Sequence, residues 1–124
     1  MHRRTLALLC GLLASSASAS TWVRVAQAPT GAVLLDTDSV LHNGPVRTFR
    51  VEFMKSGAPN SPIAYEIDHW SIDCAKMTIA SLAIMQFDPS GKAVPGNNQP
   101  AYYPEWVPIA PKSIGFELYH LVCR

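Results

Sequence analysis

The sequence predicts an α+β fold, in which an antiparallel sheet of about five to six strands carries a C-terminal helix packed on one face. Three observations lead to this prediction. Between residues 22 and 87, short apolar or alternating runs are separated by turns that contain proline or glycine. After Pro111 the apolar spacing changes to that of a helix. Cys74 and Cys123 close a predicted strand and the predicted helix, so a disulfide between them would tie the helix to the sheet.

Length and composition indicate one small folded domain. The chain has 124 residues, of which 48% are hydrophobic and 15% are charged, and its formal net charge is +1. Nucleic-acid binding normally needs a strongly basic surface, so this charge argues against a DNA or RNA partner. The ten prolines and seven glycines favour many turns between short elements.

Residues 1–19 have the three parts of a secretory signal peptide. A basic start is followed by an apolar stretch at residues 6–14 and by a small-residue tract with an Ala-x-Ala cleavage site. The apolar stretch is about half the length of a membrane-spanning helix, so residues 20–124 are predicted to form one exported domain without a transmembrane segment. Cys10 suggests a lipoprotein signal as the alternative, but the large Leu9 precedes it. The expected location is the periplasm, the cell surface or the medium.

Five segments have the pattern of β-strands. Residues 22–26 and 32–36 are short apolar runs joined by a Pro-Thr-Gly turn, which is typical of a hairpin. Residues 46–55 alternate between a face that carries two phenylalanines and a polar face, as in a half-buried strand. Residues 65–74 and 76–87 follow with a short connection between them, which predicts antiparallel neighbours.

The segment Asp36-Thr37-Asp38-Ser39 is predicted to form a turn. Its side chains can bond the local backbone, which favours a turn that starts one helical turn through Val40 and Leu41. The alternative is a cation site, because Asp36 and Asp38 offer two hard oxygen ligands. The turn needs fewer assumptions, so we expect no metal here.

The last third of the chain begins with a loop and ends with a helix. Prolines and glycines between residues 88 and 100 predict a long loop, and a sixth strand is uncertain at residues 102–107. Ser113 is a good N-cap for a helix from Ile114 to about Val122. Apolar residues surround most of this helix, so it should be covered on more than one side, by the sheet and by a loop or a second copy of the chain.

No pattern of residues indicates catalysis, a cofactor or a metal. Asp68 and His69 are adjacent in a strand, so their side chains should point to opposite faces and cannot form a catalytic pair. His42, His69 and His120 are expected in a loop, a strand and a helix, without metal-ligand spacing. A nucleophilic thiol is the alternative role for the two cysteines, but it needs a nearby base and leaves one cysteine unused. The protein is therefore predicted not to be an enzyme.

The aromatic residues are the better candidates for partner binding. Tyrosine and tryptophan combine a large contact area with a polar group. Trp70 shares its strand face with Cys74, which favours packing in the core. For three residues beside the proline-rich loop, partner binding and packing are both open: Tyr102, Tyr103 and Trp106.

Several motifs, taken in order, resemble the surface-adhesin E family over nearly all of the exported domain. They are Trp22-Val23-x-Val25, Leu35-Asp36-x-Asp38-Ser39-Val40, Ile72-Asp73-Cys74, Trp106-x-Pro108-x-x-Pro111-x-Ser113-Ile114-Gly115 and Leu121-Val122-Cys123. The resemblance implies a secreted bacterial module with a six-stranded antiparallel sheet, a C-terminal helix on its concave face, a disulfide at Cys74 and Cys123, and a homodimer.

For function, the resemblance implies attachment to host extracellular-matrix or plasma proteins such as laminin and vitronectin. Residues 58–73 contain no lysine or arginine, so this segment offers no positive charge to an acidic partner. Two alternatives follow. One is a periplasmic envelope factor that binds another bacterial protein, and the other is a small metal-binding or hydrolytic periplasmic protein.

Overall fold

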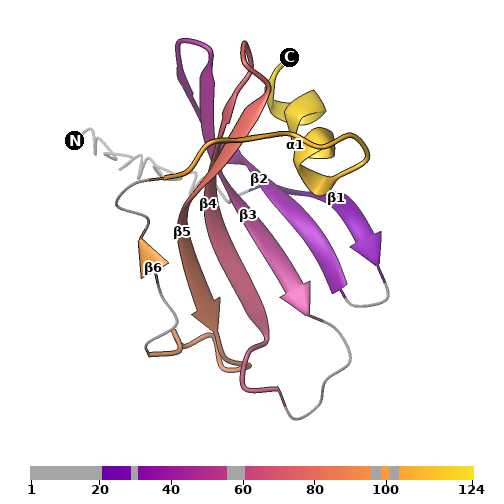
Figure 1. Cartoon of the computed structure of the whole chain (residues 1–124). Coiled ribbons are helices and arrows are strands. Elements are labelled where there is room, and N and C mark those ends of the chain that lie inside the picture. The colour runs from indigo at the N-terminus through magenta and orange to yellow at the C-terminus, as the bar shows by residue number, and fades with distance from the viewer. Residues whose placement is uncertain (1–20, 29–30, 56–60, 96–98, 101–103) are drawn as a thin grey trace, which may run out of the picture.

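The structure is a computed structural model, and it describes residues 21–28, 31–55, 61–95, 99–100 and 104–124. The described part contains one sheet and one helix (Figure 1). No helix in these ranges is long and apolar enough to cross a membrane. The elements are β1 (Trp22–Ala28), β2 (Gly31–Asn43), β3 (Val46–Lys55), β4 (Tyr65–Asp73), β5 (Thr78–Phe87), β6 (Gln99–Pro100), β7 (Val107–Pro108) and α1 (Ile114–Val122).

The sheet is an antiparallel meander in which β1 to β5 are neighbours in chain order. The two-residue strands β6 and β7 both pair with β5. The predicted α+β fold is therefore confirmed. Of the uncertain sixth strand at residues 102–107, the structure describes residues 104–107, and among these only Val107 is in a strand, while β6 lies earlier. Pro104 and Pro108 lack a backbone N–H, which limits pairing in this segment.

One face of the sheet carries the core, and we call it the helix face. Phe49 and Val51 of β3 are almost fully buried on it, with exposed fractions of 1% and 0%, and Ile72 of β4 is also fully buried. The register places Phe49 opposite Trp70 and Val51 opposite Asp68, so these side chains share the face. The alternation predicted for residues 46–55 therefore sets which side of the sheet the helix covers.

The predicted helical turn at residues 36–41 is wrong, because β2 continues as a strand to Asn43. Pairing with β3 is interrupted between Asp36 and Leu41, and local polar groups replace the missing ladder bonds. The Asp38 N–H donates to Asp36 Oδ1. Ser39 Oγ donates to the Asp36 carbonyl and accepts from the Arg50 N–H. The side chains do bond the local backbone, but they stabilise an irregular strand.

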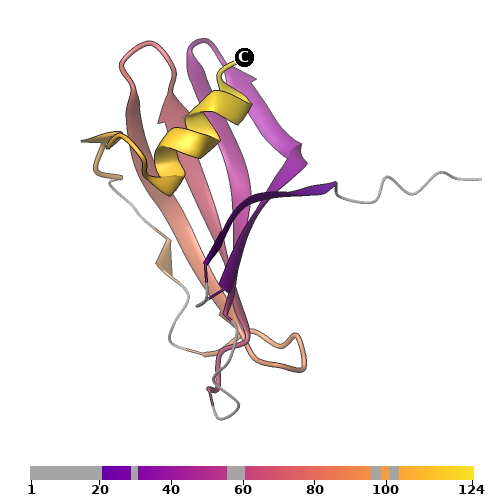
Figure 2. The ribbon, with the colours of Figure 1, turned by 90° about the vertical axis from the view of Figure 1, so that its right-hand side faces the viewer.

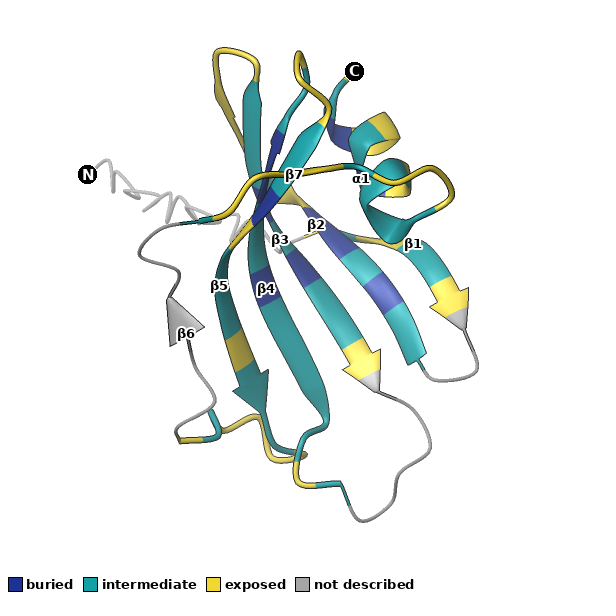
Figure 3. Cartoon of the chain, viewed as in Figure 1, coloured by how far each residue is buried: buried dark blue, intermediate teal, exposed yellow. Residues whose placement is uncertain are grey.

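Helix α1 packs on the helix face and covers only one end of it (Figures 2 and 3). Ser113 caps the helix as predicted, since its Oγ accepts the Phe116 N–H at 3.2 Å. Leu118 and Val122 are buried in the core cluster of the sheet. Leu121 is 37% exposed, so one part of the broad apolar surface of the helix has no cover within the described chain.

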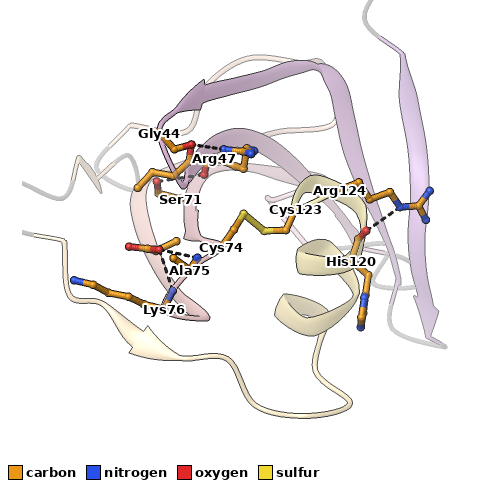
Figure 4. Close-up of a disulfide and its surroundings, with 11 residues drawn as sticks. Gly44, Arg47, Ser71, Cys74, Ala75, Lys76, His120, Cys123 and Arg124 are labelled. Atoms are coloured by element: carbon orange, nitrogen blue, oxygen red, sulfur yellow. Dashed lines mark hydrogen bonds between the residues drawn. A yellow bond between two sulfur atoms is a disulfide. The ribbon is translucent and has the colours of Figure 1, made fainter.

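The predicted disulfide joins Cys74, after β4, to Cys123, after α1 (Figure 4). The sulfur atoms are 2.07 Å apart and the two Cα atoms 5.6 Å apart, which are ordinary disulfide distances. Both cysteines pack against the core cluster. The bond fixes the C-terminal end of the helix to the tip of the β4–β5 hairpin.

Candidate functional site

One edge of the sheet has three exposed apolar side chains, and we call it the β7 edge: Met77, Trp106 and Val107. Their exposed fractions are 40%, 41% and 43%. Val107 pairs with Ile79 of β5, and the Ile109 N–H donates to the Met77 carbonyl at 3.0 Å, so the backbone holds these residues next to each other. Trp106 is thus available to a partner. The other two predicted binding residues, Tyr102 and Tyr103, lie outside the described ranges.

The three tryptophans do not form one patch. Trp70 packs against the core cluster, as predicted, with its ring centroid 5.5 Å from that of Phe53. Trp22 pairs in register with Asp36, while the next residue pairs with the core residue Leu35, so alternation places Trp22 on the opposite face from Trp70. Trp106 is the most exposed of the three, and it was predicted as a binding candidate.

Two hollows open on other parts of the described surface, and the sequence did not indicate either. A mainly apolar groove of about 290 Å³ lies between β1, β2 and the end of α1, and a hollow of about 370 Å³ lies beside the irregular part of β2. The groove is lined by Val23, Leu35, Thr37, Val40, His42, Leu121, Val122 and Arg124. The second hollow is lined by Asp38, Ser39, Leu41, Thr48, Phe49, Arg50 and His69.

The three histidines considered as metal ligands are on three different elements. His42 is in β2 and not in a loop, which corrects the prediction, because β2 extends to Asn43. His69 is in β4, where burial and the nearby Arg50 lower its pKa. His120 is in α1, with its ring centroid 4.5 Å from that of Phe116. Within the described ranges, no three His, Cys, Asp or Glu side chains gather as metal ligands would.

Asp36 and Asp38 have separate structural roles. Asp36 is fully buried and forms an ion pair with Arg50 through Oδ2. Asp38 is exposed, and its Oδ2 accepts the Thr21 N–H at 3.0 Å. A buried carboxylate needs such a cation, because losing water without a charged partner is costly. Asp36 and Arg50 are register partners at the end of the regular part of the β2–β3 ladder, and this pairing between strands is not visible in the sequence.

Asp68 is the most unusual acidic residue of the described chain. It is 4% exposed, on the helix face, and its Oδ2 accepts the Trp70 Nε1–H at 3.2 Å. Burial, and next the neighbouring Glu66 carboxyl, raise the pKa of Asp68 to about 7. His69 pairs with Arg50 on the opposite face, so Asp68 and His69 do not form a catalytic pair. Because residues two apart share a strand face, the alternation of residues 65–74 would put Asp68 on the face of Trp70 and Ile72, a sign of a buried carboxyl group that the sequence-based prediction did not use.

We expect the stability of the protein to decrease as pH rises toward 7. The pKa of Asp68 is 3.8 in an ordinary setting and about 7 in the folded chain, so between these pH values the folded state holds a proton that the unfolded state has lost. The contribution of Asp68 to this decrease is at most about 1.4 kcal/mol per pH unit. Urea unfolding between pH 4.5 and 8 measures this slope.

Asp68→Asn is the matched variant for this prediction, because asparagine keeps the shape and does not titrate. The lowered pKa of His69 acts with the opposite sign, since a depressed histidine gains stability as pH rises. This contribution is common to both proteins and cancels in the difference. Parallel pH profiles for the wild type and the variant would contradict the prediction.

Comparison with known proteins identifies the family to which the chain is related. The model of the family described as "Surface-adhesin protein E" matches residues 22–124, which include every described element. The chain belongs to the surface-adhesin protein E family. As a family member it is an adhesin-like protein, in agreement with the resemblance found in the sequence motifs. The comparison with curated proteins gave no match.

Solved structures of Haemophilus influenzae protein E have the same fold. One matches with a TM-score of 0.59 and 10% identity, over 82% of this chain and 83% of that chain. A second crystal form has a TM-score of 0.59, 9% identity, and coverage of 82% and 86%. A structure from a non-typeable strain has a TM-score of 0.54, 9% identity, and coverage of 82% and 74%. At this identity the likeness concerns the fold alone.

Proposed function

We propose that the chain is an exported, non-enzymatic module that binds another protein, with residues 1–19 removed as a signal peptide and 20–124 as the single mature domain. The observation that carries the proposal is the family match over residues 22–124. The exposed β7 edge adds a surface suited to a protein partner, because tryptophan is enriched among the residues that dominate binding energy. A homodimer stays a prediction.

The proposed partners are host extracellular-matrix or plasma proteins, and the alternative is a second protein of the bacterial envelope. The location of the protein in the cell distinguishes these two kinds of partner. Intact producing cells are treated with a protease, and released peptides from residues 48–55 are measured by mass spectrometry beside a periplasmic marker. Release while the marker stays intact supports host attachment. Release only after the outer membrane is opened excludes host attachment and favours the envelope partner.

Trp106→Ala is expected to weaken binding to immobilised laminin or vitronectin by about tenfold or more. The fold should be unaffected, because a side chain that is 41% exposed contributes little to the core. Surface plasmon resonance measures the affinity, and thermal unfolding confirms the fold. Leu41→Ala is the matched control, since Leu41 is 67% exposed in β2, away from the β7 edge. Equal affinities for both variants and the wild type would contradict a role for Trp106.

A further inference from the structure

Two carboxyl groups lie close together on the helix face of β4. Glu66 pairs in register with Phe53 and Asp68 with Val51, so both acids point to the side that carries the core. Glu66 is partly buried, and Asp68 lies deeper, with 4% of its surface exposed. Asp68 Oδ2 accepts from Trp70, whereas no N–H or O–H donor of the described ranges reaches the buried Oδ1. The Asp68 carboxyl group is also within hydrogen-bond reach of the Glu66 carboxyl group, so the two acids need either a shared proton or a cation between them.

No described side chain brings a positive charge to this pair. On β5 the register neighbours are Ile84 and Gln86, and Gln86 Nε2 donates to Glu66 Oε2 at 2.9 Å. Residues 78–87 contain no charged residue. The described charged side chains of β3 are placed elsewhere: Arg50 and Glu52 alternate to the opposite face, and Arg47 pairs with Ile72 and donates to main-chain carbonyls.

The surroundings are suited to an organic cation. Phe53 and Trp70 form a tilted ring pair on the same face, and an aromatic ring attracts an ammonium or guanidinium group. A carboxylate shielded from water forms stronger charge-assisted hydrogen bonds than one in solvent. Helix α1 covers the other end of the face (Figure 3), so no helix of the described chain closes this end.

We propose that Glu66 and Asp68, beside the Phe53–Trp70 ring pair, form a binding site for the ammonium or guanidinium group of a lysine or arginine side chain on a partner protein. This inference rests on the protein-binding function proposed above and names the chemistry of the partner. It also fits residues 58–73, which contain acidic residues and no lysine or arginine.

The raised pKa of Asp68 supports the site and gives it a signature. Without a cation, burial and Glu66 favour the protonated acid up to about pH 7. A bound cation favours the charged carboxylate, so binding expels a proton and becomes tighter as pH rises. The side chains that face Asp68 from β3 and β5 at this level, Val51 and Ile84, do not titrate.

The test uses the mature chain and NMR detection of the Trp70 indole N–H, which contacts Asp68 directly. The probes are the N-acetyl methylamides of lysine and arginine, and the neutral norleucine analogue is the control. Trp70→Phe assigns the resonance. At pH 8 the cationic probes should shift it saturably, with dissociation constants in the millimolar range, and norleucine should not. Because the pKa of Asp68 is about 7, binding should be about thirtyfold weaker at pH 5.5 than at pH 8.

Two isosteric variants test the carboxyl groups. Asp68→Asn and Glu66→Gln should each weaken binding of the cationic probes about tenfold or more, while Glu105→Gln, an exposed acid outside the site, should not. If Asp68→Asn fails to fold, binding of the cationic probes by Glu66→Gln alone tests the role of the carboxyl groups. Equal shifts with norleucine, unchanged binding in the variants, or a resonance that responds to pH but not to the cations would overturn the proposal. The last result would leave a structural pair that shares a proton.

These results are independent of the partner experiments. The probes are small molecules, so a positive result does not require laminin, vitronectin or an envelope protein to bind. If the protein is displayed on the cell surface and binds host proteins but not the cationic probes, the proposed function is supported and the cation site is contradicted. If it binds the probes but none of the candidate proteins, the cation site is supported and the proposed partners are contradicted.

Discussion

Reducing the Cys74–Cys123 disulfide is expected to lower the free energy of unfolding by about 4 kcal/mol. The bond closes a loop with a sequence separation of 49, and the stabilisation comes from the lost freedom of the unfolded chain. For a domain of this size that loss corresponds to a decrease in Tm of about 15 °C or more. It is a large share of the roughly 5–15 kcal/mol that stabilises a typical domain.

Thermal and urea unfolding of the oxidised and reduced forms, followed by circular dichroism, measure the effect. The double variant Cys74→Ser, Cys123→Ser separates loss of the bond from side effects of the reductant. A reduced protein that melts within one or two degrees of the oxidised form would show that packing alone holds the helix.

Leu118→Ala is expected to destabilise the protein by about 3 kcal/mol, within the range of 2–5 kcal/mol typical of buried leucines. Leu118 is fully buried and lies in the same core cluster as Phe49 and Val51. The substitution leaves a cavity between the helix and the sheet. The disulfide still fixes the C-terminal end of the helix to the sheet, so the variant should remain folded and should unfold at a lower urea concentration than the wild type.

Leu121→Ala is the matched control on the same helix, because Leu121 is 37% exposed. Its expected cost is below about 1 kcal/mol. Similar losses for the two variants would mean that Leu121 is covered in solution. A second copy of the chain over the groove at Val23 and Leu121 would give this result, and the loss at Leu121 would then depend on protein concentration.

The sequence predicts best what depends on local patterns. The alternation at residues 46–55 matches β3 residue for residue, and the cap at Ser113 starts α1 as predicted. The failure at residues 36–41 has a distant cause: Ser39 bonds to Arg50 on the next strand, and turn-forming side chains reveal nothing of that pairing. The predicted bonds between side chains and local backbone in this segment are confirmed, and the predicted helical turn is wrong.

The candidate sites were harder to predict for the same reason. Trp106 was predicted as a binding candidate because its residue type and its loop are both visible in the sequence; it is exposed, and its role in binding stays a prediction. The acidic pair was missed because Asp68 was compared with its chain neighbour His69. The relevant neighbours are two residues away on the same face, Glu66 and Trp70, and one strand away, Phe53. Strand register, which no single segment encodes, brings these groups together.

The meander order of the sheet also bears on how an exported chain reaches its final form. Each of the strands β2 to β5 pairs with the one before it, so hairpins can assemble successively as the chain emerges into its compartment. Helix α1 emerges last, and its docking completes the core. The Cys74–Cys123 bond can therefore form only after α1 has emerged, 49 residues later than Cys74, and an oxidant that acts before then cannot make this bond.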